Sequence, residues 1–172
     1  LPAPARTGVS NFISNLNEVP RLANCALQAD QNKVNATVIR LFTNTVLGVG
    51  GLFDVATGLG FDKQDEDFGQ TLGVWGVPQG PYIVLPFLGP STGRDTIGLV
   101  ADWYTDPLTY VNDGGVAWGL KALRVIDRRA ELLAASKVLE QAALDPYAFV
   151  RDGFLQRRRN DIYDGNPPPE PD

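Results

Sequence analysis

The chain has 172 residues, of which 44% are hydrophobic and 20% are charged, and this composition fits one globular domain. It contains no histidine and one cysteine, Cys25, which excludes histidine-based nucleophiles and acid–base catalysis, an internal disulfide, and zinc sites built on histidine or cysteine clusters. The net charge of −5 disfavours a protein that binds nucleic acid through nonspecific phosphate contacts.

Helical spacing of apolar residues predicts helices in the first third of the chain. The first has Thr7 or Ser10 as its cap and should end at Pro20, where a new helical segment restarts and carries Cys25. Asp30 or Asn32 can cap the next helix, which should end at Gly48 in a left-handed conformation. One face of that helix is apolar and carries Val34, Val38, Leu41, Phe42 and Val46.

An acidic run at residues 62–67 is predicted to be a solvated loop that leads into a helix N-terminus. The alternative, a calcium site, lacks the glycine and the final glutamate of a calcium loop. The next 26 residues, 68–93, carry no charged side chain, but six glycines and four prolines disfavour a transmembrane helix. We predict a helix to about residue 75 and then an irregular apolar hairpin, with its bend at 76–81 and its return arm at 82–88.

Four further helical signals follow the hairpin. Ser91 or Thr92 should cap a helix, with Asp95 three residues after Thr92, and Asp106 should cap the next one, with a proline in its first turn. A long helix is predicted at 116–144, and Asp145 opens the last one. The fold class is therefore all-α with one apolar hairpin, as a single helical domain at 1–160 followed by a proline-rich tail at 161–172.

Carboxylates are the acid–base groups that this composition leaves. Asp95 and Asp102 are seven residues apart and share a helix face, as the paired acids of a glycosidase could, but roles as caps and arginine partners are favoured. Cys25 lies on an apolar helical stripe and is read as core packing. The glycines at 48–51 lack the ending of a phosphate loop. We expect neither an enzyme nor a bound cofactor or metal.

The uncharged stretch is either a buried core loop or a membrane element, and composition leaves both open. Several aromatic residues that favour a membrane–water boundary flank or follow it: Trp75, Tyr82, Trp103, Tyr104, Tyr110 and Trp118. The arginines of the last helix, Arg151 and Arg157–Arg159, either meet anionic headgroups or form a solvated helix end.

Two consecutive motifs carry a family resemblance. Residues 68–82 read FGQTLGVWGVPQGPY and residues 85–95 read LPFLGPSTGRD. Supporting stretches lie at 4–12, 40–54, 129–133 and 145–147, so the match extends from residue 4 to about 160. In these features the chain resembles the MlaA/VacJ family of Gram-negative outer-membrane lipoproteins.

The resemblance implies a ring-like helical domain in the periplasmic leaflet of the outer membrane. An amphipathic pore through it would remove phospholipids from the outer leaflet and so keep lipid asymmetry. The implied partners are phospholipid, a trimeric outer-membrane porin and a periplasmic lipid-binding protein. The alternative is a porin-binding scaffold that positions lipid-transfer partners without conducting lipid. The family's signal peptide, lipid-modified cysteine and N-terminal helical segment are not in this sequence, which also lacks an initial methionine, so we expect a truncated chain.

Candidate site residues follow from the hairpin and from the resemblance. The predicted pore hairpin and hinge are Gly76, Pro78, Gly80 and Pro81. The predicted lipid contacts are Trp75, Val84, Leu85 and Phe87. The predicted polar pore lining is Arg94 and Asp95. Because the two glycines bracket a stiffer link, the segment could shift as a unit and gate the pore, or it could be a static turn.

Overall fold

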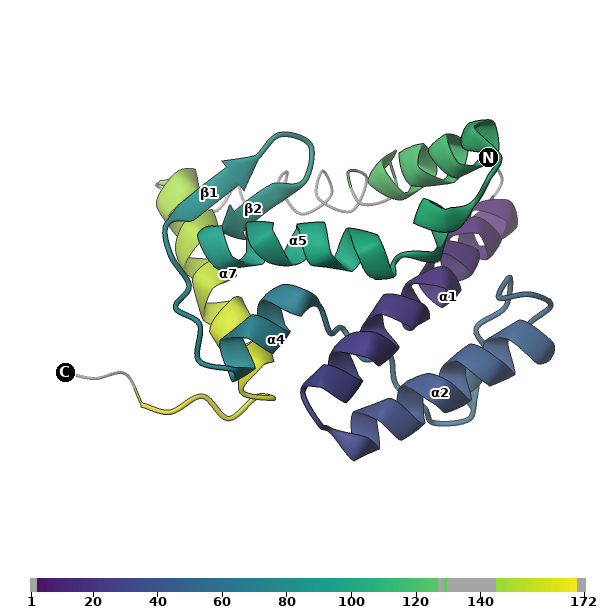
Figure 1. Ribbon diagram of the computed structural model, residues 1–172, viewed down its shortest axis with the longest axis horizontal. Coiled ribbons are helices and arrows are strands. Elements are labelled where there is room, and N and C mark those ends of the chain that lie inside the picture. Colours follow the sequence, from purple (N-terminus) through teal and green to yellow (C-terminus); the bar gives the residue numbers. More distant parts are fainter. Residues whose placement is uncertain (1–2, 127–128, 130–144, 170–172) are drawn as a thin grey trace.

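The computed structural model describes residues 3–126, 129 and 145–169 and is built mainly of helices (Figure 1). Two long helices, α1 (Ala3–Leu27) and α2 (Gln31–Val46), pack against each other. Asp30 begins α2, because its carboxylate accepts hydrogen bonds from the backbone N–H groups of Asn32 and Lys33. The predicted all-α fold class is confirmed.

Pro20 lies inside α1 and does not interrupt it, so the predicted restart at this residue is wrong. The missing proline N–H removes one helical hydrogen bond, which is a local cost. Side chains on both sides of the proline hold the helix in place. Glu18 accepts a hydrogen bond from Arg40 Nε at 3.1 Å, and Asn24 Nδ2 donates to Asp102 at 2.8 Å. Tertiary contacts therefore keep α1 continuous where the local signal predicts a break.

Gly48 follows α2, but its backbone is not left-handed, which corrects the prediction for this residue. The left-handed residues are the next three, Val49, Gly50 and Gly51, with φ angles of 54°, 69° and 93°. A Cβ atom at Gly48 would lie 2.2 Å from the carbonyl oxygen of Phe53. Glycine is required at position 48 because the chain folds back closely over it.

The remaining elements follow in chain order. A short helix, α3 (Val55–Gly58), precedes the acidic segment at 62–67, which leads into α4 (Phe68–Val74). A linker at 75–81 connects α4 to β1 (Tyr82–Leu85) and β2 (Gly89–Thr92), and α5 (Gly93–Thr105) follows. Then come the 3-10 helix η1 (Pro107–Tyr110), a helix at 114–126 and α7 (Pro146–Ile162). Most of the predicted helix beyond residue 126 lies outside the described residues.

The helix starts predicted from capping residues are confirmed. Thr92 accepts a hydrogen bond from the Asp95 N–H at the start of α5. Asp106 accepts from the Leu108 N–H at the start of η1. Asp145 caps α7, with its proline in the first turn. A cap is a local interaction, so the sequence is sufficient to place it.

The hairpin is a regular two-stranded antiparallel sheet, and its bend lies elsewhere than predicted. Tyr82 pairs with Thr92 and Leu85 with Gly89, so the turn is at residues 86–88. Residues 82–85 are the first strand and not the return arm, and the segment at 76–81 precedes the hairpin. The turn forms around Phe87 and Gly89, both of which have positive φ angles, 64° and 85°.

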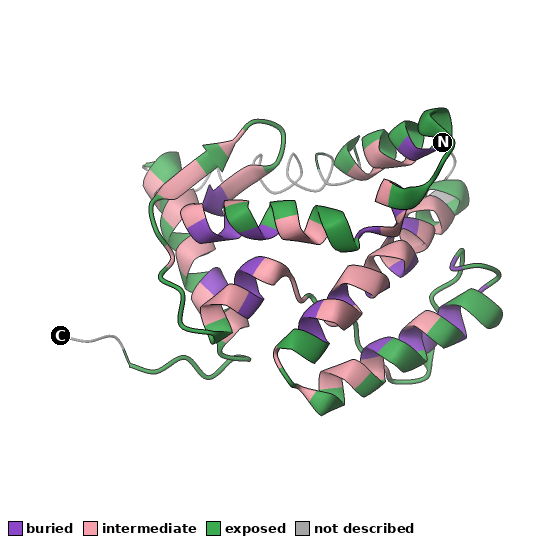
Figure 2. Cartoon of the chain, viewed as in Figure 1, coloured by how far each residue is buried: buried purple, intermediate pink, exposed green. Residues whose placement is uncertain are grey.

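Figure 2 shows where the buried positions lie along the chain, and most of these buried residues are polar or charged. Among the described residues, the buried hydrophobic side chains are Ile13, Cys25, Ala56, Leu108 and Ala117. A longer set of polar and charged residues is buried, and it includes Glu18, Asn24, Arg40, Thr71, Arg94, Asp95 and Arg158. This is the reverse of an ordinary globular domain, in which charged residues are seldom fully buried.

Helix α2 is the clearest case of this reversal. Its polar face is buried, with Arg40 only 1% exposed beside Thr37. Its apolar face points outward, and Phe42 is 68% exposed. Helix α5 likewise exposes Ile97 and Val100. Among the described helices, none combines the length and apolar character needed to cross a bilayer.

Candidate functional site

A cavity of about 820 Å³ lies between α4, the start of the 75–81 linker, the first turn of α5 and α7. Its apolar lining includes Val77, Leu155 and Ile162. Its polar lining includes Gln79, Arg94 and Arg159. The lining of the cavity therefore combines apolar and polar side chains.

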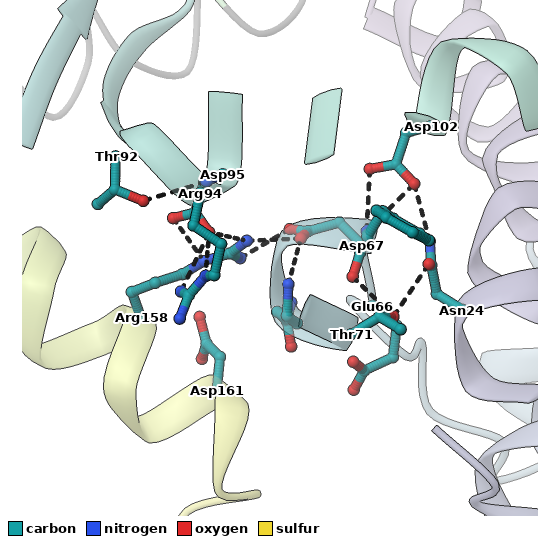
Figure 3. Close-up of polar contacts among 12 residues, drawn as sticks. Asn24, Glu66, Asp67, Thr71, Thr92, Arg94, Asp95, Asp102, Arg158 and Asp161 are labelled. Atoms are coloured by element: carbon teal, nitrogen blue, oxygen red, sulfur yellow. Dashed lines mark hydrogen bonds and ion pairs between the residues drawn. The ribbon is translucent and has the colours of Figure 1, made fainter. Parts of the chain in front are cut away.

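Arg158 on α7 is the centre of the polar network beside this cavity (Figure 3). Its Nη1 donates to Asp67 Oδ2 at 2.7 Å, and its Nε donates to Asp95 Oδ2 at 2.9 Å. A Cβ atom at Gly69 would lie 2.6 Å from Arg158 Nη2. The absence of a side chain at Gly69 thus lets one guanidinium reach two carboxylates on two other elements.

Arg94 joins this network and also faces the cavity. Its Nε and Nη2 donate to Asp95 Oδ1 at 3.2 and 3.1 Å. Its backbone N–H donates to the carbonyl oxygen of Gln79 at 3.1 Å, which ties the linker to the start of α5. The Nε2 atom of Gln79 is buried without a hydrogen-bond partner. The polar side of the cavity therefore keeps hydrogen-bonding capacity that the described residues do not use.

The network shifts the pKa values of its members. Burial by itself would raise the pKa of Asp67, but hydrogen bonds and the charge of Arg158 outweigh it and hold this pKa below its usual value. Burial by itself would lower the pKa of Arg158, but its bonds to Asp67 and Asp95 raise it. Burial raises the pKa of Asp161, whose carboxyl lies close to the network in Figure 3. Arg158 and Asp67 are thus held as charged partners.

Asp102 lies on the other side of α4 (Figure 3). Its carboxylate accepts hydrogen bonds from Asn24 Nδ2 at 2.8 Å and from the Phe68 N–H at 3.1 Å. The Thr71 hydroxyl in turn donates to Asn24 Oδ1 at 3.0 Å. Burial is the largest influence on Asp102 and raises its pKa. Asp95 is held by two arginines and Asp102 by an amide and a backbone N–H, so neither stands as a free acid of a catalytic pair.

The predicted hinge and lining residues lie around the cavity. Gly76 and Arg94 line it, whereas Pro78, Gly80 and Pro81 are on the same linker outside the lining. Gly76 and Gly80 have left-handed φ angles of 85° and 71°. Asp95 lies behind Arg94 and is itself buried. The pore and hinge roles of these residues stay predictions.

The predicted lipid contacts lie on the outside of the fold. Trp75 and Val84 are each more than half exposed, and Phe87 at the hairpin turn is 75% exposed. Leu85 is half-buried. Their contact with lipid stays a prediction.

Sequence reasoning missed the network itself. The acidic segment was predicted to be solvated, but Asp67 binds Arg158, and Glu66 accepts a hydrogen bond from Lys33 Nζ at 2.8 Å. The sequence predicts that Arg158 meets headgroups or belongs to a solvated helix end, yet it is buried. The glycines are the sequence signal of the close packing between α4 and α5. A Cβ atom at Gly98 would lie 2.4 Å from the backbone nitrogen of Gly69. Among the residues that the structure describes, no group of acidic residues and cysteine is placed to hold a metal ion.

Residues 1–161 match the family described as MlaA lipoprotein. The chain belongs to the MlaA lipoprotein family. It is 40% identical over 161 residues to the intermembrane phospholipid transport system lipoprotein MlaA of Escherichia coli strain K12, across 91% of this chain and 63% of that protein. It is 33% identical over 169 residues to the MlaA lipoprotein of the same transport system in Haemophilus influenzae, across 96% of this chain and 67% of that protein.

A solved structure described as "Structural basis for maintenance of bacterial outer membrane lipid asymmetry" has the same fold. The TM-score is 0.78 at 37% sequence identity, and the match covers 96% of this chain and 82% of that one. The chain thus spans somewhat less than two thirds of the Escherichia coli relative and most of the solved relative. The family resemblance seen in residues 68–95 is confirmed.

Proposed function

We propose that this chain belongs to an outer-membrane component of intermembrane phospholipid transport and provides the path by which phospholipid leaves the outer leaflet. The observation that carries the proposal is the reversed polarity of the fold. Charged groups such as Arg40 and Arg158 are inside, while Phe42 and Ile97 are outside. The relative in Escherichia coli, named for phospholipid transport, supports the same conclusion.

The exterior suits a position within a lipid layer. In water, exposed apolar surface costs about 25 cal/mol per Å², and a monomer rarely carries large continuous patches of it. Among acyl chains this cost disappears, and the outward faces of α2 and α5 gain contacts. The interior can remain polar because its charges pair with one another, as Arg40 does with Glu18 and Asp54.

The cavity suits the two parts of a phospholipid. A headgroup can follow Arg94 and Gln79, while acyl chains follow Val77, Leu155 and Ile162. A bare polar headgroup in hydrocarbon would cost several kcal/mol, so a path needs a polar side. An amphipathic lining lowers that barrier without any chemical step. Transport without catalysis also fits a chain that has no histidine.

We place the molecule in the periplasmic leaflet of the outer membrane and propose that a lipid anchor holds it there, which the word lipoprotein in the family description supports. A trimeric porin would be its neighbour in the membrane, and a periplasmic lipid-binding protein would receive the phospholipid. The porin-binding scaffold that conducts no lipid is the alternative. The amphipathic cavity favours conduction over the scaffold, because a scaffold has no use for such a lining.

Filling the cavity tests this proposal. Leu155→Trp places a larger ring into the lining, and Phe149→Trp on the exposed side of the same helix is its matched control. The full-length protein carrying each change is expressed in cells that lack their own MlaA, and surface phospholipid is labelled with a membrane-impermeant amine-reactive dye. We expect surface phospholipid to rise with Leu155→Trp only, with porin binding unchanged. Normal surface phospholipid with Leu155→Trp would favour the scaffold.

A further inference from the structure

Four exposed aromatic side chains gather where α5 ends and the 114–126 helix begins. Trp103 and Tyr104 are in the last turns of α5, Tyr110 ends η1, and Trp118 follows one turn into the next helix. Each is more than half exposed, and Trp118 is 71% exposed. The Tyr110 hydroxyl donates to the carbonyl oxygen of Tyr104 at 2.7 Å. We call these four residues, together with Lys121, the aromatic rim.

Lys121 is the cation of this rim. Its Nζ lies 5.2 Å from the ring centroid of Trp103 and 6.0 Å from that of Trp118. The other two lysines in the described part of the chain pair with carboxylates, Lys33 with Glu66 and Lys63 with Asp65. Lys121 has no carboxylate partner among the described residues. Its ammonium group is therefore held by two rings and remains available to an anion.

The two indole N–H groups of the rim also have no hydrogen-bond acceptor in the described part of the chain. The indole N–H groups of Trp103 and Trp118 donate to no described residue. The N–H of Trp75, the third tryptophan of the chain, instead donates to the carbonyl oxygen of Leu27 at 3.2 Å. A free N–H is costly among acyl chains, whereas a satisfied one is tolerated there. The three tryptophans thus differ in the depth at which each is most stable.

We propose that the aromatic rim lies in the headgroup layer of the bilayer, where Lys121 pairs with lipid phosphate and the rim sets the depth of the molecule. Trp75 then lies deeper, among acyl chains. This inference rests on the proposed function, since it requires a membrane-embedded molecule. Tryptophan, tyrosine and a lysine that extends toward water are the residues that stabilise such a boundary.

A membrane boundary explains the rim better than a protein partner does. An apolar protein surface laid over it would bury two indole N–H groups and one ammonium without acceptors, which is costly. Phosphate and ester oxygens supply acceptors to all three at once. The outward face of α2 provides the contrast. It carries Phe42 and Val46, which have no polar atom, and therefore suits the acyl region.

Because the chain has three tryptophans, its depth can be read from fluorescence. Three single-tryptophan versions of the full chain are made by changing the other two residues to phenylalanine. Each is reconstituted into phosphatidylcholine vesicles that carry bromine either near the headgroup or near the chain end. We expect shallow bromine to quench Trp103 and Trp118 at least about twofold more than deep bromine does, and Trp75 to show the opposite order.

The outcomes separate the rim from the proposed function. If Trp75 is quenched by bromolipid while Trp103 and Trp118 stay open to aqueous acrylamide, the molecule is embedded but the rim is not at the boundary, and a protein partner covers it instead. If bromolipid quenches none of the three, membrane embedding itself fails. Equal depth for all three tryptophans would also overturn the proposal that the aromatic rim lies in the headgroup layer.

Lys121→Gln isolates the ammonium group. We expect this change to reduce the difference between shallow and deep quenching of Trp118, because the phosphate contact that fixes its depth is lost. Lys63→Gln, which removes a lysine from the acidic segment, is the matched control and should leave the quenching profile unchanged. An unchanged profile with Lys121→Gln would remove the lysine from the proposal.

Discussion

Arg158 and Asp67, which are 91 residues apart in the sequence, form a bidentate ion pair that joins α7 to the start of α4. The same carboxylate accepts a hydrogen bond from the Gln70 N–H at 2.9 Å and so caps α4. Arg158 also binds Asp95 on α5. One guanidinium therefore fixes three helices around the cavity.

Replacing Arg158 should destabilise the fold strongly. Arg158→Gln leaves Asp67 and Asp95 without their main cation, and the loss of one partner from a buried ion pair costs about 3–5 kcal/mol. Urea unfolding of the protein in micelles measures the change. Arg157→Gln is the control, because its side chain is 77% exposed and lies 3.8 Å from Asp161, and such a pair is worth at most about 1 kcal/mol. Equal losses for the two variants would contradict the central role of Arg158.

The contribution of Asp67 to stability should reverse its pH dependence in Arg158→Gln. The folded-state pKa of Asp67 lies below its ordinary value of 3.8, so this group's contribution is present above that value and is lost as the pH falls through the lowered pKa. In Arg158→Gln, the hydrogen bond from the Gln70 N–H remains, but burial loses its main counterweight and raises the pKa of Asp67. The contribution is then lost as the pH rises through the raised value. The unfolding free energies of the unchanged protein and of Arg158→Gln are measured across acidic pH, each relative to the same protein carrying Asp67→Asn. The two differences should have opposite slopes against pH, and a common slope would refute the assignment.

The close approach of α4 and α5 depends on Gly98. Gly98→Ala would place a methyl group 2.4 Å from the backbone nitrogen of Gly69, so the two helices must separate. We expect a loss of about 1–3 kcal/mol, as for overpacking in a core. Gly119→Ala is the matched control, because its Cβ atom would meet nothing within 4 Å, and alanine favours a helix by about 1 kcal/mol. Thermal unfolding compares the two, and a tolerated Gly98→Ala would show that the helices can move apart freely.

The sequence predicts local features of this fold well and long-range ones poorly. The caps at Thr92, Asp106 and Asp145 depend on neighbours in the chain, and all three form. The periodicity of α2 also identifies its two faces correctly. It does not say which face is buried, because that depends on the solvent around the protein: Arg40 turns inward to Glu18 and Asp54.

The candidate site shows the same division. Glycine and proline mark unusual backbone wherever they occur, and Gly76 and Gly80 do have left-handed φ angles in the linker. The pore roles of these glycines and of Arg94 stay predictions. The partnership of Arg158 with Asp67 was missed, because no local rule relates residues that far apart. Likewise, Pro86 and Gly89 bound the actual turn of the hairpin, while an equally strong signal at 76–81 marks a linker. Which of the two signals becomes the hairpin turn depends on which segments pair as strands, and a single sequence does not show that pairing.

The hairpin should contact acyl chains at Val84. A spin label at this exposed strand position is expected to collide more often with oxygen, which dissolves in the bilayer, than with a water-soluble nickel complex. A label at exposed Asp62 in the acidic segment is the control and should show the opposite preference. Fully aqueous accessibility at Val84 in vesicles would overturn the predicted lipid contact. The same measurement at Phe87 extends the test to the turn.

The linker should act as a gate if it has a second conformation. Val77 N–H donates to the Leu72 carbonyl oxygen on one side, and Arg94 N–H donates to the Gln79 carbonyl oxygen on the other, so Gly76 lies at one end of a tied segment. Its φ of 85° is incompatible with proline, whose φ is fixed near about −65°.

Gly76→Pro can therefore fold well only by holding the linker in another conformation. A gate predicts a variant with normal helicity and membrane binding whose lipid passage changes at least about tenfold, since opening motions of this kind often limit the rate. Gly76→Asn is the control, because asparagine tolerates left-handed φ and should keep passage near normal. A static turn predicts instead that Gly76→Pro loses helicity. Circular dichroism and passage of fluorescent phospholipid between vesicle leaflets distinguish the two, and normal helicity together with normal passage would end the gate hypothesis.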